Sequence, residues 1–213
     1  MVGNLNFVLK KDSKSPTHHL LINGPTGCGK SSLVRSLAGI WKCGGIISKP
    51  LKFGHDGIFF VPQRPHFTEG TLRDQIIYPH ERSIVDDKTL SDILTKAEAE
   101  SIFLQYSGFN STYPWDTVLS PSEKQKLAFA RLFYHKPDFA ILDESTVHLD
   151  LTTEHNLLNT TKELGITIIS IGHRNSLKKY HDTLLKFDGR GGYRIEPLAP
   201  ADLSKVEGSD SEW

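Results

Sequence analysis

The sequence predicts an α/β protein: a mostly parallel β-sheet flanked by helices, with a helical subdomain inserted into it. Two observations predict this fold class. Short apolar segments alternate with helical segments along the 213 residues, and a glycine-rich loop stands between one such segment and the first helix. A chain of this length can bury the core of one full domain.

The strand candidates are short and either apolar throughout or alternating. They are Leu5–Leu9, His19–Ile22, Gly45–Ile47, Ile58–Val61, Phe139–Leu142, Ile166–Ile171, Thr183–Phe187 and Gly192–Ile195. Helices are expected at about Lys30–Ala38, Asp86–Glu98, Ser122–His135 and Leu151–Leu164. The middle of the chain has helical patterns and no strong strand, which predicts a helical subdomain at about residues 71–125. Residues 1–196 then form the domain, and the small, acidic residues 197–213 are expected to be a disordered tail.

The phosphate loop is the most specific motif in the chain. Residues 24–32 fit the pattern G-x-x-x-x-G-K-[ST] and follow an apolar strand candidate. Backbone N–H groups in such a loop surround phosphate oxygens, Lys30 reaches the β and γ phosphates, and Ser31 offers its hydroxyl to Mg²⁺. The positive end of the helix that begins near Lys30 attracts the same anion. We therefore expect nucleoside triphosphate binding by Gly24, Pro25, Thr26, Gly27, Cys28, Gly29, Lys30, Ser31 and Ser32.

Two carboxylates follow a buried strand candidate. Phe139–Leu142 leads directly into Asp143 and Glu144. An acid at a strand end holds Mg²⁺ beside substrate phosphates, which suits Asp143, while Glu144 is placed to polarise an attacking water as a general base. The alternative is a charged strand end that only meets solvent, and the upstream phosphate loop favours the functional interpretation.

Two further strand candidates end in polar side chains. His173 follows Ile166–Ile171, and its imidazole is able to hydrogen-bond a γ phosphate and sense its loss. Gln63 follows Ile58–Val61 and is able to ligate Mg²⁺ or a water on it. Each signal is weak by itself, since such residues are more often structural than catalytic.

A strong helix start precedes the segment Ser122–His135. Ser120 is a natural N-cap, Pro121 suits the first helical position, and Ser120 with Glu123 matches a capping box. A purely structural role explains these residues fully. The functional alternative makes this N-terminus a second anion site, offered to a phosphate held by another subunit.

Composition limits the partners. The 25 Lys and Arg residues balance 25 Asp and Glu residues, so nothing favours nucleic acid. No apolar stretch reaches the roughly 18 residues of a membrane span, so this chain alone is expected to be soluble. Cys28 and Cys43 form no disulfide framework and suit reduced thiols facing the cytosol.

The order of these motifs resembles the nucleotide-binding domain of ATP-binding cassette (ABC) transporters. The set runs phosphate loop, Gln63, the signature-like segment Leu119–Glu123, Asp143-Glu144 and His173. The segments Gly70–Pro79, Ala130–Pro137 and Gly172–His181 look like those of subfamily D, the peroxisomal and lysosomal half-transporters. Leu119-Ser120-Pro121 and Ile171–Arg174 look more like the lysosomal branch implicated in cobalamin export than the peroxisomal acyl-CoA importers.

The resemblance implies Mg²⁺ and ATP as cofactors and two cassettes in a head-to-tail dimer, with two ATP molecules at the interface. Each ATP would lie between the phosphate loop of one subunit and the signature segment of the other. The implied roles are metal binding by Ser31, Gln63 and Asp143, catalysis by Glu144 as base and His173 as switch, signature contacts in trans by Ser120, Pro121, Ser122 and Glu123, and an interface loop with Asp150. The implied partners are a second nucleotide-binding domain and the transmembrane domain of a half-transporter, at the cytosolic face of a lysosomal or peroxisomal membrane.

The chain departs from the family pattern in three places. Pro121 and Ser122 replace adjacent glycines of the signature, Val147 and His148 replace small residues, and the family's first strand with its adenine-stacking aromatic lies upstream of residue 1. We expect a fragment or truncated product of a longer half-transporter, with ATP hydrolysis driving transport of a cobalamin or fatty acyl-CoA class substrate. The alternatives are a regulatory, degenerate cassette with little hydrolysis, and a soluble ABC ATPase.

Overall fold

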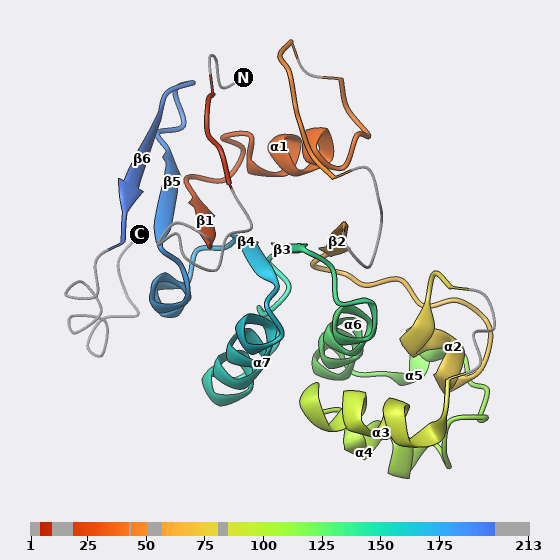
Figure 1. The fold of residues 1–213 in the computed structure, drawn as a ribbon. Coiled ribbons are helices and arrows are strands. Elements are labelled where there is room, and N and C mark those ends of the chain that lie inside the picture. The colour runs from red at the N-terminus through yellow and green to blue at the C-terminus, as the bar shows by residue number, and fades with distance from the viewer. Residues whose placement is uncertain (1–4, 10–18, 43, 51–56, 81–84, 199–213) are drawn as a thin grey trace.

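The fold is built on a six-stranded sheet with strand order β2-β3-β4-β1-β5-β6 (Figure 1). The computed structural model describes residues 5–9, 19–42, 44–50, 57–80 and 85–198. Neighbouring strands run parallel except for β6, which pairs antiparallel with β5. The strands are β1 (Leu20–Asn23), β2 (Ile58–Val61), β3 (Phe139–Asp143), β4 (Thr167–Ile171), β5 (Thr183–Phe187) and β6 (Tyr193–Pro197). This confirms the predicted α/β class.

Helices cover both faces of the sheet, with α1 on one side and α6 and α7 on the other (Figure 1). The helices are α1 (Lys30–Leu37), α2 (Leu72–Ile77), α3 (Asp87–Lys96), α4 (Glu100–Gln105), α5 (Trp115–Val118), α6 (Pro121–His135) and α7 (Leu151–Glu163), and a 3₁₀ helix η1 spans Asn175–Tyr180. Strands β1 and β4 are buried along their whole length, which explains why apolar residues dominate both.

The sheet separates two hydrophobic cores, a smaller one on the side of α1 and a larger one on the side of α6 and α7. Side chains along β1 alternate between these two cores. Leu20 and Ile22 point towards α1 and pack with Val34, whereas Leu21 belongs to the larger core under α6 and α7. These apolar contacts on both sides hold the middle of the sheet in place. The loops at the strand ends therefore stand on a rigid support.

Between β2 and β3, helices α2 to α5 pack beside α6, and their apolar residues share the larger core (Figure 1). Thr71 begins α2 with a capping box to Asp74, and the indole of Trp115 donates to the Gly70 backbone oxygen at 2.9 Å. The buried Arg131 of α6 donates to the backbone oxygens of Gln75 at 2.6 Å and His66 at 2.7 Å. Burial lowers the pKa of Arg131 to about 10. The region is helical as expected, while the subdomain limits of 71–125 stay a prediction.

Two strand predictions were wrong. In the described part of the chain, neither Leu5–Leu9 nor Gly45–Ile47 pairs with a strand. The alternation in the first segment does have a structural meaning, since Leu5, Phe7 and Leu9 pack against the α1-side core while Val8 is 73% exposed. Ile46 in the second segment is fully exposed, so its apolar character does not come from a buried strand.

Some element limits also differ from the expectation. Pro197 is the last residue of β6 and does not belong to the predicted tail, while residues 199–213 and Cys43 lie outside the described residues. The short helices α2, α4 and α5 were not predicted one by one. None of the helices in the described ranges is long and apolar enough to cross a membrane.

Candidate nucleotide site

Four neighbouring strands deliver the predicted site residues to one edge of the sheet. The phosphate loop follows β1, Gln63 follows β2, Asp143 ends β3 and His173 follows β4. Because these strands are parallel neighbours, their carboxyl ends lie at the same edge, as Figure 1 shows. This is where open α/β sheets bind ligands.

The phosphate loop needs glycine at its first position. Gly24 is buried with a φ of 151°, and a Cβ there would lie 2.9 Å from the Cys28 sulfur and from the Phe187 backbone oxygen. The Gly24 N–H bonds to the side-chain oxygen of Asn23. At the other end of the loop Gly29 has a φ of 107° and immediately precedes α1. The loop therefore turns sharply between β1 and the start of a helix.

Lys30 is held inside this loop. Its ammonium donates to the backbone oxygens of Gly24 at 2.6 Å and Pro25 at 2.9 Å, and the residue is 7% exposed. Those acceptors are neutral, so they orient the amine without cancelling its positive charge. Ser31, the next residue, is exposed at the first turn of α1.

Glu144 is the meeting point of three strand ends. Its Oε2 accepts a hydrogen bond from Gln63 Nε2 at 2.9 Å, and its Oε1 lies 3.8 Å from His173 Nε2. Its backbone N–H donates to the Ile171 backbone oxygen at 3.0 Å, and its φ is 47°. Glu144 therefore occupies the left-handed region, which is unusual for a residue with a side chain. The contacts to neighbouring strands keep its carboxylate beside the amide and the imidazole.

Asp143 is half-buried, and three charged side chains act on it: Glu144, Arg35 and Lys30. Burial raises its pKa, and the neighbouring carboxylate of Glu144 raises it further, while Arg35 and Lys30 lower it. A carboxylate that is costly to ionise in the free protein gains from a nearby cation. The described residues contain no group of three or more His, Cys, Asp or Glu side chains fit to hold a metal on their own. The donors Ser31, Gln63 and Asp143 match Mg²⁺ in type, because Mg²⁺ takes few protein oxygens and completes its shell with phosphate and water.

The signature segment lies elsewhere. Ser120 caps α6, accepting from the Glu123 N–H at 3.3 Å, while Glu123 Oε2 accepts from the Ser120 N–H at 2.8 Å. The capping box is thus confirmed. Figure 1 shows this end of α6 beside α5, at the opposite end of the helix from β3. Within one chain, Ser120, Pro121, Ser122 and Glu123 are not brought to the phosphate loop.

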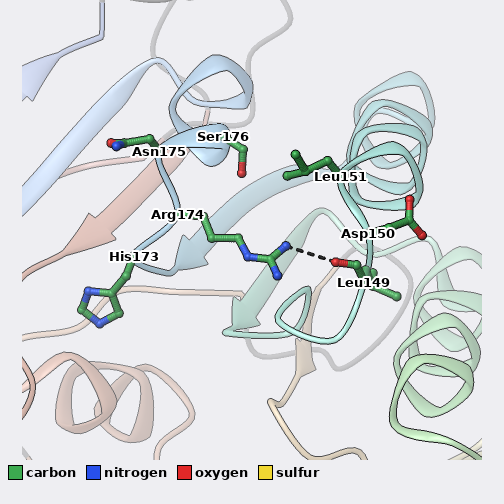
Figure 2. Close-up of a pocket in the computed structure, with 7 residues that line it drawn as sticks. All are labelled: Leu149, Asp150, Leu151, His173, Arg174, Asn175 and Ser176. Carbon is green, nitrogen blue, oxygen red and sulfur yellow. Dashed lines mark hydrogen bonds between the residues drawn. The ribbon is translucent and has the colours of Figure 1, made fainter. Parts of the chain in front are cut away.

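The segment after Glu144 contains a contact that motif reasoning missed. Asp150 caps α7 by accepting from the Thr153 N–H at 2.9 Å, and this backbone bond lowers the Asp150 pKa. Arg174, directly after His173, donates to the backbone oxygen of Leu149 at 3.2 Å, and Figure 2 shows its side chain pointing away from His173. The sequence feature that could have pointed to this contact is an arginine directly after His173, the predicted switch residue.

With this geometry the fold and site define a nucleotide-binding domain, and the comparisons identify its family. The chain belongs to the ABC transporter family, whose profile matches residues 9–147. It is homologous to subfamily D: human "ATP-binding cassette sub-family D member 3" is 41% identical over 204 residues, covering 93% of this chain and 30% of that protein. The human "Lysosomal cobalamin transporter ABCD4" is 41% identical over 184 residues, covering 83% and 30%.

A solved structure supports the same assignment. A bacterial Atm1-family ABC exporter with ATP bound superposes with a TM-score of 0.71 at 25% identity, over 90% of this chain and 35% of that chain. This likeness confirms the expected ABC ATPase fold, while the sequence relatives confirm subfamily D. The chain spans 30% of the length of these human relatives.

Proposed function

We propose that this chain binds Mg·ATP and hydrolyses it to drive an ABC transporter of subfamily D. The observation that carries the proposal is the contact of Glu144 with Gln63 and His173 at the sheet edge that also holds the phosphate loop. A carboxylate, an amide and an imidazole from three strand ends have no need to meet for the fold alone. They match the needs of water activation and phosphate sensing.

Binding begins with the phosphate loop. Backbone N–H groups of residues 26–32, which include the start of α1, surround the phosphate oxygens, and Lys30 supplies a positive charge that its present carbonyl partners leave uncancelled. The amine is thus already placed inside the loop.

The metal would be held by the Ser31 hydroxyl, Asp143 and Gln63. Because Gln63 Nε2 is engaged by Glu144, its oxygen Oε1 is the atom left for a hard cation or its water. When bound, Mg²⁺ neutralises phosphate charge and so stabilises the charge that develops in phosphoryl transfer.

Hydrolysis then depends on Glu144 and His173. Glu144 orients a water in line with the γ phosphate and accepts its proton as the water oxygen bonds to phosphorus and the bond to the leaving β-phosphate oxygen breaks. Gln63 fixes the carboxylate by its hydrogen bond. His173 donates a hydrogen bond to the γ phosphate and loses that partner when phosphate departs.

The signature segment is proposed to act on the ATP of a second copy or a homologous cassette. On this proposal, Ser120 to Glu123 and the Asp150 loop lie at a head-to-tail interface. The cassette extends through β6 to Pro197 and includes a helical subdomain at 71–125. It works with the transmembrane domain of a half-transporter on the cytosolic face of a lysosomal or peroxisomal membrane. The proposed substrate class is cobalamin, by analogy with the human lysosomal cobalamin transporter, or fatty acyl-CoA.

A second candidate is a regulatory cassette that binds ATP with little turnover. The favouring observation lies in the first turn of α6: Pro121 has no N–H, and the Glu123 N–H is taken by Ser120. Ser122 then supplies the remaining amide of that turn, and it carries a side chain where close approach to phosphate is required.

Phosphate release with bound-nucleotide measurements on the purified chain tests the proposal. We expect ATP binding, Mg²⁺-dependent turnover that is slow in the isolated monomer, and ATP-stabilised dimers after Glu144→Gln. An unchanged ATP affinity and oligomeric state in Glu144→Gln would show that Glu144 is not the base or that the signature cannot close the dimer. Wild-type turnover that stays at background and appears only after Ser122→Gly would favour the regulatory candidate.

A further inference from the structure

Arg174 joins three parts of the molecule next to the nucleotide site. It follows His173 in the segment after β4, and its Nη2 donates to the Val147 backbone oxygen at 2.9 Å. Its Nη1 donates to the Leu149 backbone oxygen and to the Glu154 carboxylate, both at 3.2 Å, and Figure 2 shows the first of these bonds. One guanidinium thus bridges the His173 segment, the segment after Glu144 and helix α7.

The carboxylate of Glu154 anchors this bridge. Glu154 is 1% exposed, and its second oxygen accepts from the Ser176 hydroxyl at 2.7 Å. A buried carboxylate must keep its partners, because losing one leaves a charge without compensation. The ion pair therefore holds the guanidinium in one orientation, and its remaining N–H groups are aimed at the two backbone oxygens.

The segment tied in this way connects two functional positions. It starts at Glu144, whose N–H is bound to Ile171 of β4, and it ends at Asp150, the cap of α7. Val147 and Leu149 lie between them. Leu149, Asp150 and Leu151 also line one wall of an open pocket whose other wall is formed by residues 173–176 (Figure 2). Arg174 thus spans the two walls.

We propose that Arg174 is a positioning residue for the ATPase reaction, an inference that rests on the proposed function. It fixes the position of residues 147–150 relative to the segment that carries His173. A displacement of His173 on loss of phosphate then moves Asp150 with it, so the state of one nucleotide reaches the surface offered to the second cassette. Arg174 acts through these segments and touches no substrate.

Hydrogen exchange and turnover together test this role. The variants are Arg174→Gln, Arg174→Lys and a matched control, Arg194→Gln, which alters an exposed arginine of the edge strand β6. Exchange is followed in residues 147–151 and in residues 24–32, with and without Mg·ATP. In Arg174→Gln we expect exchange in 147–151 to become about tenfold faster, while ATP still protects 24–32 as in the wild type.

Steady-state ATPase measurements on these variants should show a large change in kcat and little change in KM. We expect kcat of Arg174→Gln to fall about tenfold, while KM for ATP stays within about twofold of the wild-type value. Arg174→Lys should recover part of kcat, because its ammonium keeps the ion pair with Glu154 but cannot bond both backbone oxygens as the planar guanidinium does. Unchanged exchange in 147–151 would overturn the inference. So would faster exchange with normal kcat in an active protein, since the contact would then be only structural. A wild type whose residues 24–32 gain no protection from ATP would instead refute the proposed function.

Discussion

At the carboxyl edge of the sheet, side chains from three strand ends meet within one chain, whereas at the start of α6 the polar groups meet only each other. Gln63, Glu144 and His173 come from segments far apart in the sequence and lie in contact. Ser120 and Glu123, three positions apart, bond reciprocally and complete a helix cap. In the first region distant segments assemble the proposed site within a single chain, and in the second a local cap closes on itself.

This difference shows how the domain divides its work. The sheet edge is positioned by buried strands and so is available before any partner arrives. The α6 start has two of its first three amides removed or occupied, by Pro121 and by the Ser120 cap. Binding of ATP should therefore depend on the sheet edge alone, while turnover should respond to both regions.

The largest expected effect comes from Lys30→Ala at the sheet edge. Removing the loop's charge should raise the dissociation constant for ATP by about 100-fold, because a charge-assisted phosphate contact is lost. Fluorescent nucleotide titration measures this, with Lys88→Ala on the exposed face of α3 as control. ATP binding of normal strength in Lys30→Ala would break the assignment of this edge as the nucleotide site.

At the same sheet edge, Asp143→Asn should impair the proposed metal-dependent reaction without destabilising the fold. We expect Mg²⁺-dependent phosphate release to fall by about 100-fold as the only carboxylate of the proposed metal set is lost. Burial raises the Asp143 pKa in the folded chain, so the folded state binds more protons than the unfolded state above pH 3.8, and stability falls as pH rises through that window. The nucleotide-free variant should thus melt slightly higher than wild type at pH 7. A lower melting temperature there would contradict the assigned cost of ionisation.

The signature region should show smaller effects, confined to turnover. Ser122→Gly removes a side chain from the first turn of α6, and Pro121→Gly restores an amide donor. We expect each to raise turnover several-fold, with ATP affinity of the monomer unchanged. A change in that affinity would mean that this end of α6 contacts nucleotide within its own chain, and the comparison would fail.

The smallest effect is expected from Ser120→Ala. Losing the N-cap should lower the free energy of unfolding by about 1 kcal/mol. Chemical denaturation detects this, and Ser120→Thr, which keeps a hydroxyl, is the matched control. Monomer ATP affinity should stay the same, which sharpens the separation of the two regions. A Ser120→Ala variant as stable as wild type would show that the cap observed at α6 contributes nothing to stability.

The sequence by itself determined the parts of this protein that rest on local chemistry. The loop at residues 24–32, the apolar strands β1, β3 and β4, and the cap of α6 are each encoded within a few neighbouring residues, so pattern and spacing were enough. Periodicity failed where pairing mattered: Leu5–Leu9 alternates like a strand, yet in the described chain its apolar residues pack on the core without a ladder partner.

Only the tertiary structure decided which distant side chains meet. The pairing of Gln63 with Glu144 spans 81 residues and depends on β2 lying next to β3 in the sheet, a neighbourhood that no local pattern records. The three-way contact of Arg174 has the same origin, because it requires β4, the segment after β3 and α7 to be packed together. Local sequence selects the groups that can do chemistry, and long-range packing sets the distances between them, since only burial of the whole core brings those segments together.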